Sequence, residues 1–240
     1  MKLVKLPAKG RVIFVGDTHG DSNVSEDIIR RYLKSDNRIV FLGDYVDRGY
    51  DSSGNVDFLL DTRAKNPKQV YLLQGNHEGY MIESYNNADF WYSLDSKEQQ
   101  RFFNIFKEFP YAVSVDGIIA VHGALPNVKN LSDINKIRIG SSNWKALTWG
   151  DYSENEVFYN EGLRKSYFQG DFEKTMQRLG KKVLIRSHDP GVPVSIYDGK
   201  CVTLFSTSSV RRGGERTIAI ADFSKHPKVK TIDDLIIERF

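Results

Sequence analysis

The stretch RIVFLGDYVDRG, residues 38–49, decides how this chain is expected to fold. It begins with an apolar run and then presents Asp44, Asp47 and Arg48 within a few residues of Gly43. A short apolar run bounded by a glycine predicts a buried strand. Glycine and aspartate alone would indicate only a solvated turn. The same pattern recurs along the chain, however, so a turn is not a sufficient explanation.

Five apolar runs end in side chains that bind metals or phosphate. VIFV (12–15) precedes Asp17 and His19, VFL (40–42) precedes Asp44, YLLQ (71–74) precedes Asn76 and His77, IIAV (118–121) precedes His122, and VLIRS (183–187) precedes His188. Side chains at the carboxyl ends of neighbouring strands converge on one crevice. We therefore expect these residues to form a single site, and we expect the remaining histidine, His226, to be an ordinary surface residue.

The hydrophobic pattern predicts an α/β fold. Strands over 11–15, 38–42 and 69–73 alternate with helices over 21–34 and 52–65, which is typical of a parallel sheet with right-handed crossovers. A capping-box spacing from Ser96 to Gln99 predicts a further helix. Hairpin turns are expected at Asp116-Gly117 and Asp198-Gly199, with strands over 181–185, 193–197, 200–205 and 216–221. We expect two mixed β-sheets packed as a central sandwich flanked by helices, in one domain over residues 1–240.

Composition excludes several classes of protein. The 240 residues carry a formal net charge of +3, which gives no argument for a nucleic-acid partner. Cys201 is the single cysteine, so an intrachain disulfide and a cysteine-based zinc site are excluded, and a cytoplasmic location is expected. The amino-terminal apolar run is interrupted by lysine, proline and glycine, so neither a signal peptide nor a membrane span is expected.

The clustered carboxylates and imidazoles predict a metal centre. Several such groups are too costly to bury together without a cation. Oxygen and nitrogen ligands without thiolate favour manganese, iron or zinc over calcium. There are enough ligands for two ions that share a bridging carboxylate, and paired ions of this kind catalyse phosphoester hydrolysis.

The motifs also resemble a known family. GDTHG (16–20), GDYVDRG (43–49) and GNHE (75–78), followed by HG (122–123) and R-x-H (186–188), are similar to the metal-dependent serine/threonine phosphoprotein phosphatases. These enzymes are a branch of the calcineurin-like metallophosphoesterases. The resemblance extends from about residue 11 to about residue 206. It implies the metallophosphoesterase fold and a phosphoprotein or phosphopeptide substrate.

The resemblance implies a role for each matching residue. The first metal ion would be held by Asp17, His19 and Asp44, and the second by Asp44, Asn76, His122 and His188. Both ions, with manganese expected and iron or zinc as alternatives, would share a water that becomes a hydroxide nucleophile. His77, held in its cationic form by Asp47, would protonate the leaving group as the general acid.

Phosphate binding is assigned to two arginines. Arg48 would bind phosphoryl oxygens through its planar guanidinium group, with Asn76 beside it. Arg164, in YNEGLRKSYFQG, is the candidate for the family's second phosphate-binding arginine. The segment LFSTSSVRR (204–212) replaces the family's Ser-Ala-Pro-Asn-Tyr-Cys loop at the substrate rim. The peptide preference implied by the resemblance therefore rests on fewer matching residues than the chemistry does.

Three alternatives stay open. A hydrolase of diadenosine polyphosphates or other small phosphoesters shares the fold, but such enzymes tend to have alanine in place of Asp47 and aspartate in place of Glu78. A scaffold without catalysis predicts damaged ligands, whereas every ligand is present here. A nuclease is disfavoured by the small net charge and the intact phosphate grip. Any regulatory subunit is expected to be a separate chain, and no membrane association is expected.

Overall fold

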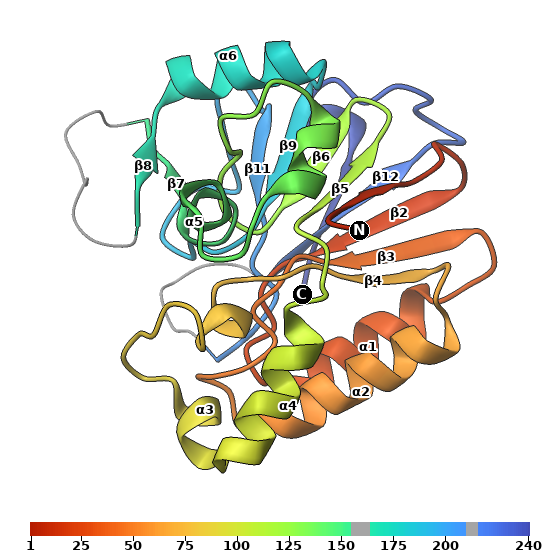
Figure 1. Cartoon of the computed structure of the whole chain (residues 1–240). Coiled ribbons are helices and arrows are strands. Elements are labelled where there is room, and N and C mark those ends of the chain that lie inside the picture. The colour runs from red at the N-terminus through yellow and green to blue at the C-terminus, as the bar shows by residue number, and fades with distance from the viewer. Residues whose placement is uncertain (155–163, 210–215) are drawn as a thin grey trace.

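The structure is a computed structural model that describes residues 1–154, 164–209 and 216–240, and its long strands form two sheets (Figure 1). The five-stranded sheet has the order β13 (Ile236–Arg239), β12 (Thr217–Asp222), β2 (Arg11–Val15), β3 (Asn37–Phe41) and β4 (Val70–Leu72). The six-stranded sheet has the order β1 (Leu3–Lys5), β5 (Ala112–Val115), β6 (Ile118–Val121), β9 (Val183–Arg186), β11 (Cys201–Thr203) and β10 (Ser195–Ile196). Each sheet contains parallel and antiparallel pairs, as predicted.

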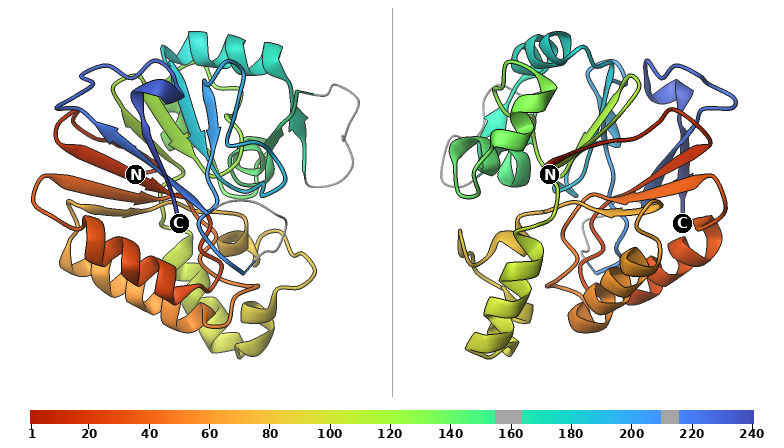
Figure 2. Two further views of the ribbon diagram at one scale, coloured as in Figure 1. Left: turned by 180° about the vertical axis from the view of Figure 1, so that it is seen from behind. Right: turned by 45° about the vertical axis from the view of Figure 1, so that its right-hand side comes forward.

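Helices cover the two outer faces of this sandwich. The outer face of the five-stranded sheet carries α1 (Ser22–Tyr32), α2 (Ser52–Lys65), the short α3 (Asp89–Ser93) and α4 (Ser96–Phe106), and that of the six-stranded sheet carries α5 (Ser142–Trp149) and α6 (Gln169–Leu179) (Figures 1 and 2). Smaller elements are the 3-10 turns η1 (His77–Gly79), η2 (Leu131–Lys136) and η3 (Ile232–Asp234), and the parallel pair β7 (Asp151–Tyr152) and β8 (Ser166–Tyr167).

The alternation of side chains along the strands produces these layers. Val12 and Phe14 of β2 join the core between the sheets, together with Ile185 of β9. Ile13 and Val15 of the same strand join the core beneath the helices. Successive side chains of a strand point to opposite faces, and both faces here are covered. This is why RVIFV is apolar at four consecutive positions rather than at every second one.

The predicted elements are mostly confirmed. The two crossover helices begin at side-chain caps, Asp21 for α1 and Asp51 for α2. The turns at Asp116-Gly117 and Asp198-Gly199 join antiparallel strands, as expected. The capping box of α4 was placed one residue too late, because Asp95 caps this helix with Glu98. Strands β1 and β13 were not predicted; both lie toward the ends of the chain, and β1 has only three residues.

Five strand ends meet at one edge of the sandwich. Strands β2, β3 and β4 contribute from one sheet and are mutually parallel. Strands β6 and β9 contribute from the other sheet and are parallel to each other. The convergence therefore occurs between two sheets rather than within one. None of the helices among the described residues is long and apolar enough to cross a membrane.

Candidate metal centre and active site

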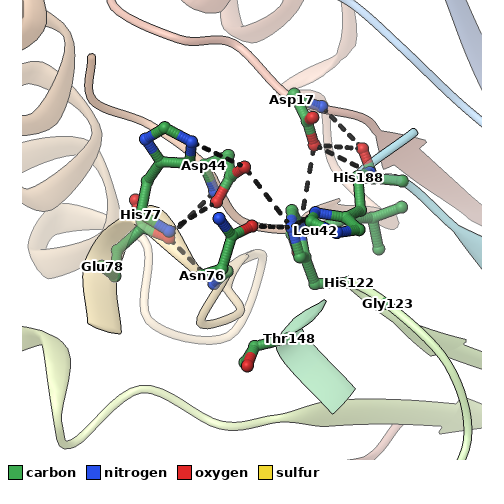
Figure 3. A network of polar contacts seen from close by, with 12 residues as sticks. Asp17, Leu42, Asp44, Asn76, His77, Glu78, His122, Gly123, Thr148 and His188 are labelled. Atoms are coloured by element: carbon green, nitrogen blue, oxygen red, sulfur yellow. Dashed lines mark hydrogen bonds and ion pairs between the residues drawn. The ribbon is translucent and has the colours of Figure 1, made fainter. Parts of the chain in front are cut away.

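Asp44 lies at the middle of the cluster where these strand ends meet (Figure 3). Its Oδ2 atom is 3.4 Å from Nε2 of His122, 3.7 Å from Nε2 of His19 and 3.8 Å from Nε2 of His77. The residue is 2% exposed and follows β3 in a left-handed backbone conformation, with φ of 55°. One carboxylate therefore faces three imidazoles that come from three different segments.

Asp17 closes the cluster on the side of His122 and His188. Its Oδ2 atom lies 3.6 Å from Nε2 of His19, and its Oδ1 atom lies 3.7 Å from Nδ1 of His122. Ser187 donates its hydroxyl to Oδ1, and the main-chain N–H of His188 donates to the same oxygen at 3.3 Å. Asp17 is thus positioned by the segment that carries His188, although it belongs to the other sheet.

Main-chain carbonyls fix the orientation of two of the histidine rings. Nδ1 of His19 donates to the carbonyl of Val46 at 3.0 Å, and Nδ1 of His122 donates to the carbonyl of Leu42 at 3.1 Å. In each ring, Nε2 then faces the carboxylates. Such a carbonyl partner is usual behind a metal-binding histidine, because it sets the tautomer and the ring orientation.

Asn76 and His188 complete the part of the cluster around His122. Nε2 of His122 lies 3.0 Å from Oδ1 of Asn76 and 3.2 Å from Nδ1 of His188. All of the predicted metal ligands, namely Asp17, His19, Asp44, Asn76, His122 and His188, are buried, and the structure brings them together. The cluster therefore combines carboxylate, amide and imidazole donors from five strand ends.

Two groups of possible metal ligands share Asp44. Among the described residues, the ligand atoms of His19, Asp44 and His77 lie within 4.8 Å of one another, and so do those of Asp44, His122 and His188. The shared carboxylate agrees with the predicted bridging position. The first group differs from the prediction, because His77 stands where Asp17 was expected. His77 is thus close enough to be a ligand or a neighbour of the site.

The electrostatics of the cluster favour added positive charge. Burial lowers the pKa of His122, but the charges of Asp44 and Asp17 outweigh this and raise it to about 9. Burial, together with the charge of Asp44, raises the pKa of the Asp17 carboxyl to about 6. The raised pKa of His122 reflects the negative potential that the two carboxylates create at the cluster. Burial lowers the pKa of His188 and of His19 well below the usual range, which leaves these rings neutral and able to bind a metal.

Three buried polar atoms at the cluster have no hydrogen-bond partner among the described residues. They are Oδ2 of Asp17, Nε2 of His19 and Nε2 of His188. Buried polar atoms are normally satisfied, so each such exception calls for an explanation. These are carboxylate and imidazole atoms that bind divalent transition metals. The residues present therefore fit a centre of divalent ions.

His77 and Asp47 form a buried pair beside this cluster. Nδ1 of His77 donates to Oδ2 of Asp47 at 2.6 Å, and Nε2 of the same ring faces Asp44. Asp47 is fully buried, and its Oδ1 accepts the main-chain N–H of Phe90 at 2.8 Å. One nitrogen of the imidazole is thus held by a buried carboxylate, and the other nitrogen points toward Asp44.

The two predicted phosphate-binding arginines lie at the solvent side of the site. Arg48 is exposed. Burial and the neighbouring His77 lower the pKa of His19, and the positive charge of Arg48 lowers it further. Arg164 donates from Nε to Oδ2 of Asp151 at 2.8 Å, and its side chain is 44% exposed. Oδ1 of Asp151 lies 3.9 Å from Nε2 of His188, so this arginine is connected to the cluster through one carboxylate.

Sequence reasoning missed the role of Glu78. This fully buried carboxylate accepts three main-chain N–H groups, from Asp44 at 2.9 Å, Tyr45 at 2.8 Å and Gly75 at 2.8 Å. It therefore holds the loop after β3 against the loop after β4. Burial, together with the charge of Asp44, raises its pKa to about 7. The signal in the sequence was its place in the GNHE motif, directly after His77. An acidic residue that is buried at such a place needs hydrogen-bond donors, and here the main chain supplies them.

Two further residues escaped the sequence analysis. Tyr85 donates its hydroxyl to Oδ2 of Asp47 at 2.6 Å from a loop without periodicity. Asp151 receives bonds from Arg164 and from Arg186, which is itself fully buried. Arg186 also donates to the carbonyls of Gly123 and Gly150, so it supports the segments around His122 and His188. Neither Tyr85 nor Asp151 lies in a motif that would have identified it.

Among the described residues, five of the ten residues other than glycine that have left-handed φ values lie at the site. Left-handed φ values occur at His19 (42°), Asp44 (55°), Asp47 (66°), Arg48 (65°) and His188 (77°). Residues other than glycine adopt this region only at a cost, and such strain gathers where function requires a particular geometry. None of these five residues packs in the hydrophobic core of either sheet. The strain therefore supports their selection as site residues independently of the motifs.

These features define a metallophosphoesterase-like site, and comparison with known proteins agrees. The chain matches the calcineurin-like phosphoesterase family over residues 10–191 and belongs to that family. A curated protein of Encephalitozoon cuniculi, named "Probable serine/threonine-protein phosphatase", is 32% identical over 222 residues. The match covers 85% of this chain but only 48% of that protein, so the chain spans about half the length of this relative.

Solved structures share the fold over the whole chain. A serine/threonine phosphatase from Saccharomyces cerevisiae with similarity to human PP5 has a TM-score of 0.82 at 22% identity, covering 100% of this chain and 83% of the other. A structure described as a "putative diadenosine tetraphosphatase" has a TM-score of 0.54 at 18% identity, covering 99% and 97%. The predicted calcineurin-like fold is thus confirmed.

Proposed function

We propose that this chain hydrolyses phosphomonoesters, with phosphoserine and phosphothreonine in proteins as its substrate class. The observation that carries the proposal is the position of Asp44, which is shared by two groups of metal ligands and faces the imidazole held by Asp47. A site of this kind places a phosphoryl group, a metal centre and a proton donor within reach of one another. The similarity to a protein named a probable serine/threonine-protein phosphatase supports the substrate class.

Divalent ions bound by this cluster would supply a Lewis acid for phosphoryl oxygens and lower the pKa of water toward neutrality. We assign the first ion to Asp17, His19 and Asp44, and the second to Asp44, Asn76, His122 and His188. The unsatisfied Oδ2 of Asp17 supports its place as a ligand. The bond between His77 and Asp47 supports the separate role of His77 as the acid.

The protein side chains orient the phosphate and supply a proton. In the overall reaction, a water oxygen bonds to phosphorus while the phosphorus–oxygen bond to the alcohol breaks. The departing oxygen takes the proton from Nε2 of His77, because Nδ1 of that ring is bonded to Asp47. The proton that the water loses on bonding to phosphorus afterwards restores the Nε2–H bond of His77. Arg48 and Arg164 bind the phosphoryl oxygens, and their planar forks suit this task.

Diadenosine polyphosphates are the competing substrate class. The similarity in fold to the diadenosine tetraphosphatase structure, with nearly complete coverage of both chains, favours this second candidate. Asp47 and Glu78 argue against it, because both are engaged here: one with His77 and the other with three main-chain N–H groups. Manganese as the metal and a cytoplasmic location remain our predictions.

The test compares two substrates with one preparation. Protein stripped by a chelator and resupplied with Mn²⁺ is given a phosphothreonine peptide or diadenosine tetraphosphate at matched concentrations, and product release is measured. Selective turnover of the peptide is expected. Turnover of the dinucleotide alone would assign the chain to the small-molecule branch of the family. Inactivity toward both substrates with metal bound would contradict a catalytic role.

A further inference from the structure

Asp47 is a buried carboxylate whose orientation depends on three hydrogen-bond donors. Oδ2 accepts from Nδ1 of His77 at 2.6 Å and from the hydroxyl of Tyr85 at 2.6 Å, and Oδ1 accepts from the N–H of Phe90 at 2.8 Å. The residue itself is fully buried. A carboxylate only accepts hydrogen bonds when ionised, so the Tyr85 hydroxyl is the donor in its pair. Two donors thus converge on one oxygen.

Tyr85 also lies against the imidazole itself. Its ring centroid is 4.5 Å from that of His77, and its hydroxyl is 3.3 Å from the main-chain oxygen of His77. On its other side, the Tyr85 ring packs edge-on against Trp149 at 5.6 Å. The half-buried Tyr85 therefore lies between the His77–Asp47 pair and Trp149. Its ring fixes the position of the hydroxyl.

We propose that Tyr85 is a positioning residue for proton donation, because its hydroxyl holds Asp47 in the orientation that directs Nε2 of His77 toward the leaving group. This inference rests on the proposed function. The side chain does not touch the phosphoryl group and acts through Asp47. Among the described residues, loss of the hydroxyl leaves His77 as the single donor to Oδ2, and only the N–H of Phe90 on Oδ1 still helps to fix the carboxylate plane.

The step that Tyr85 supports is the transfer of one proton. The Nε2–H bond of His77 breaks, and an O–H bond forms on the departing oxygen as the phosphorus–oxygen bond breaks. A strongly basic leaving group needs this proton, whereas a weakly basic one departs without it. A defect in proton donation therefore depends on the leaving group. A general loss of structure does not.

The experiment measures kcat and KM of the Tyr85→Phe variant with two substrates. Phenyl phosphate has a strongly basic leaving group, and p-nitrophenyl phosphate has a weakly basic one. We expect kcat for phenyl phosphate to fall about tenfold, the scale of one hydrogen bond to a charged group, with KM unchanged. For p-nitrophenyl phosphate the fall should be less than about twofold, because little proton transfer is needed. Both assays use the metal-loaded full chain.

Two controls separate positioning from structure. Tyr92→Phe removes a neighbouring phenol that donates to the main-chain oxygen of Tyr85 and also hydrogen-bonds with Tyr80, so it should leave both rates unchanged. In a His77→Asn background, the further change Tyr85→Phe should have no additional effect on phenyl phosphate, since the proton donor is already gone. 3-Fluorotyrosine at position 85 keeps the hydroxyl and should keep the wild-type ratio of the two rates, even if Tyr85→Phe fails to fold.

The outcomes distinguish a failure of the Tyr85 role from a failure of the proposed function. Equal losses on both substrates, no loss on either, or additive losses in the His77→Asn background would overturn the role of Tyr85 alone. A metal-loaded wild-type protein that turns over neither aryl phosphate would overturn the proposed function and this inference with it. A loss confined to phenyl phosphate and absent without His77 supports the positioning role.

Discussion

Nε2 of His77 lies 3.8 Å from Oδ2 of Asp44, the carboxylate that the two groups of metal ligands share. The same ring is held from behind by Asp47 at 2.6 Å. The proposed proton donor therefore lies directly beside the expected metal centre, at a distance that would also suit a ligand. The proposed mechanism requires that it is not one.

His77→Asn separates these two roles. As the acid, His77 should be dispensable for metal binding, so the variant should retain the wild-type metal content. Its kcat for a phosphothreonine peptide should fall by about 10²–10⁴, the usual contribution of a general acid. Metal content is measured by elemental analysis of the dialysed protein, and turnover by phosphate release. Loss of an ion in His77→Asn would make His77 a ligand instead.

His19→Ala and His188→Ala should each remove one ion. The two histidines belong to different groups around Asp44, so each variant should bind about one divalent ion per chain where the wild type binds two. Titration calorimetry with Mn²⁺ measures the stoichiometry. His226→Ala is the matched control, because its side chain is 48% exposed and lies near Asp234 rather than the cluster. An unchanged stoichiometry in both site variants would exclude the assignment.

Arg48→Lys and Arg164→Lys should weaken substrate binding while leaving the charge in place. Lysine lacks the planar fork that binds two phosphoryl oxygens. Loss of one charged hydrogen bond should raise KM for the phosphopeptide by about tenfold or more. Arg30→Lys is a suitable control, since Arg30 is 77% exposed on α1 and pairs with Asp27. A KM that follows the control in both variants would argue against phosphate binding by these arginines.

Glu78→Gln should destabilise the fold as well as the site. The glutamine amide presents an N–H group where one carboxylate oxygen now accepts main-chain N–H groups of Asp44, Tyr45 or Gly75. Leaving such a buried donor unsatisfied costs about 1–3 kcal/mol, which urea unfolding of the metal-free protein would detect. Glu26→Gln, at an exposed position of α1, should cost almost nothing. Equal stability of the two variants would contradict the bridging role of Glu78.

Gly43→Ala should be damaging for two reasons. Its φ of 118° is one that other residues rarely adopt, and a Cβ there would lie 2.5 Å from the main-chain nitrogen of Gly75 and 2.9 Å from Nδ1 of His122. We expect a loss of about 3 kcal/mol or more in the free energy of unfolding. Gly170→Ala, in α6 with no atom within 4 Å of a new Cβ, should be neutral or stabilising by up to about 1 kcal/mol.

The position of the cluster could be predicted from the sequence for a physical reason. Side chains of the cluster such as Asp17, Asp44 and His122 closely follow buried strands, and a buried strand is the element most readily recognised in a sequence. The strand boundaries were accurate at β2 and within about one residue at β3 and β4. The chemistry therefore followed from the position of each strand end.

The supporting residues could not be predicted in the same way. Tyr85 lies in an irregular loop, and Asp151 follows α5 in a two-residue strand, so neither has a period or motif that marks it. Their roles depend on distances to Asp47 and Arg186 that only the folded chain defines. The capping of α4 was misplaced because Asp95 and Ser96 are both good caps, and the choice depends on local geometry.

The most direct test of the central claim is a titration of the chelator-stripped protein with Mn²⁺ while phosphate release from a phosphothreonine peptide is measured. A paired metal centre predicts no turnover without metal and a rise to a plateau at two equivalents of Mn²⁺ per chain. Turnover that is already complete at one equivalent would contradict a paired centre around Asp44. Full turnover in the stripped protein would contradict the metal-dependent mechanism altogether.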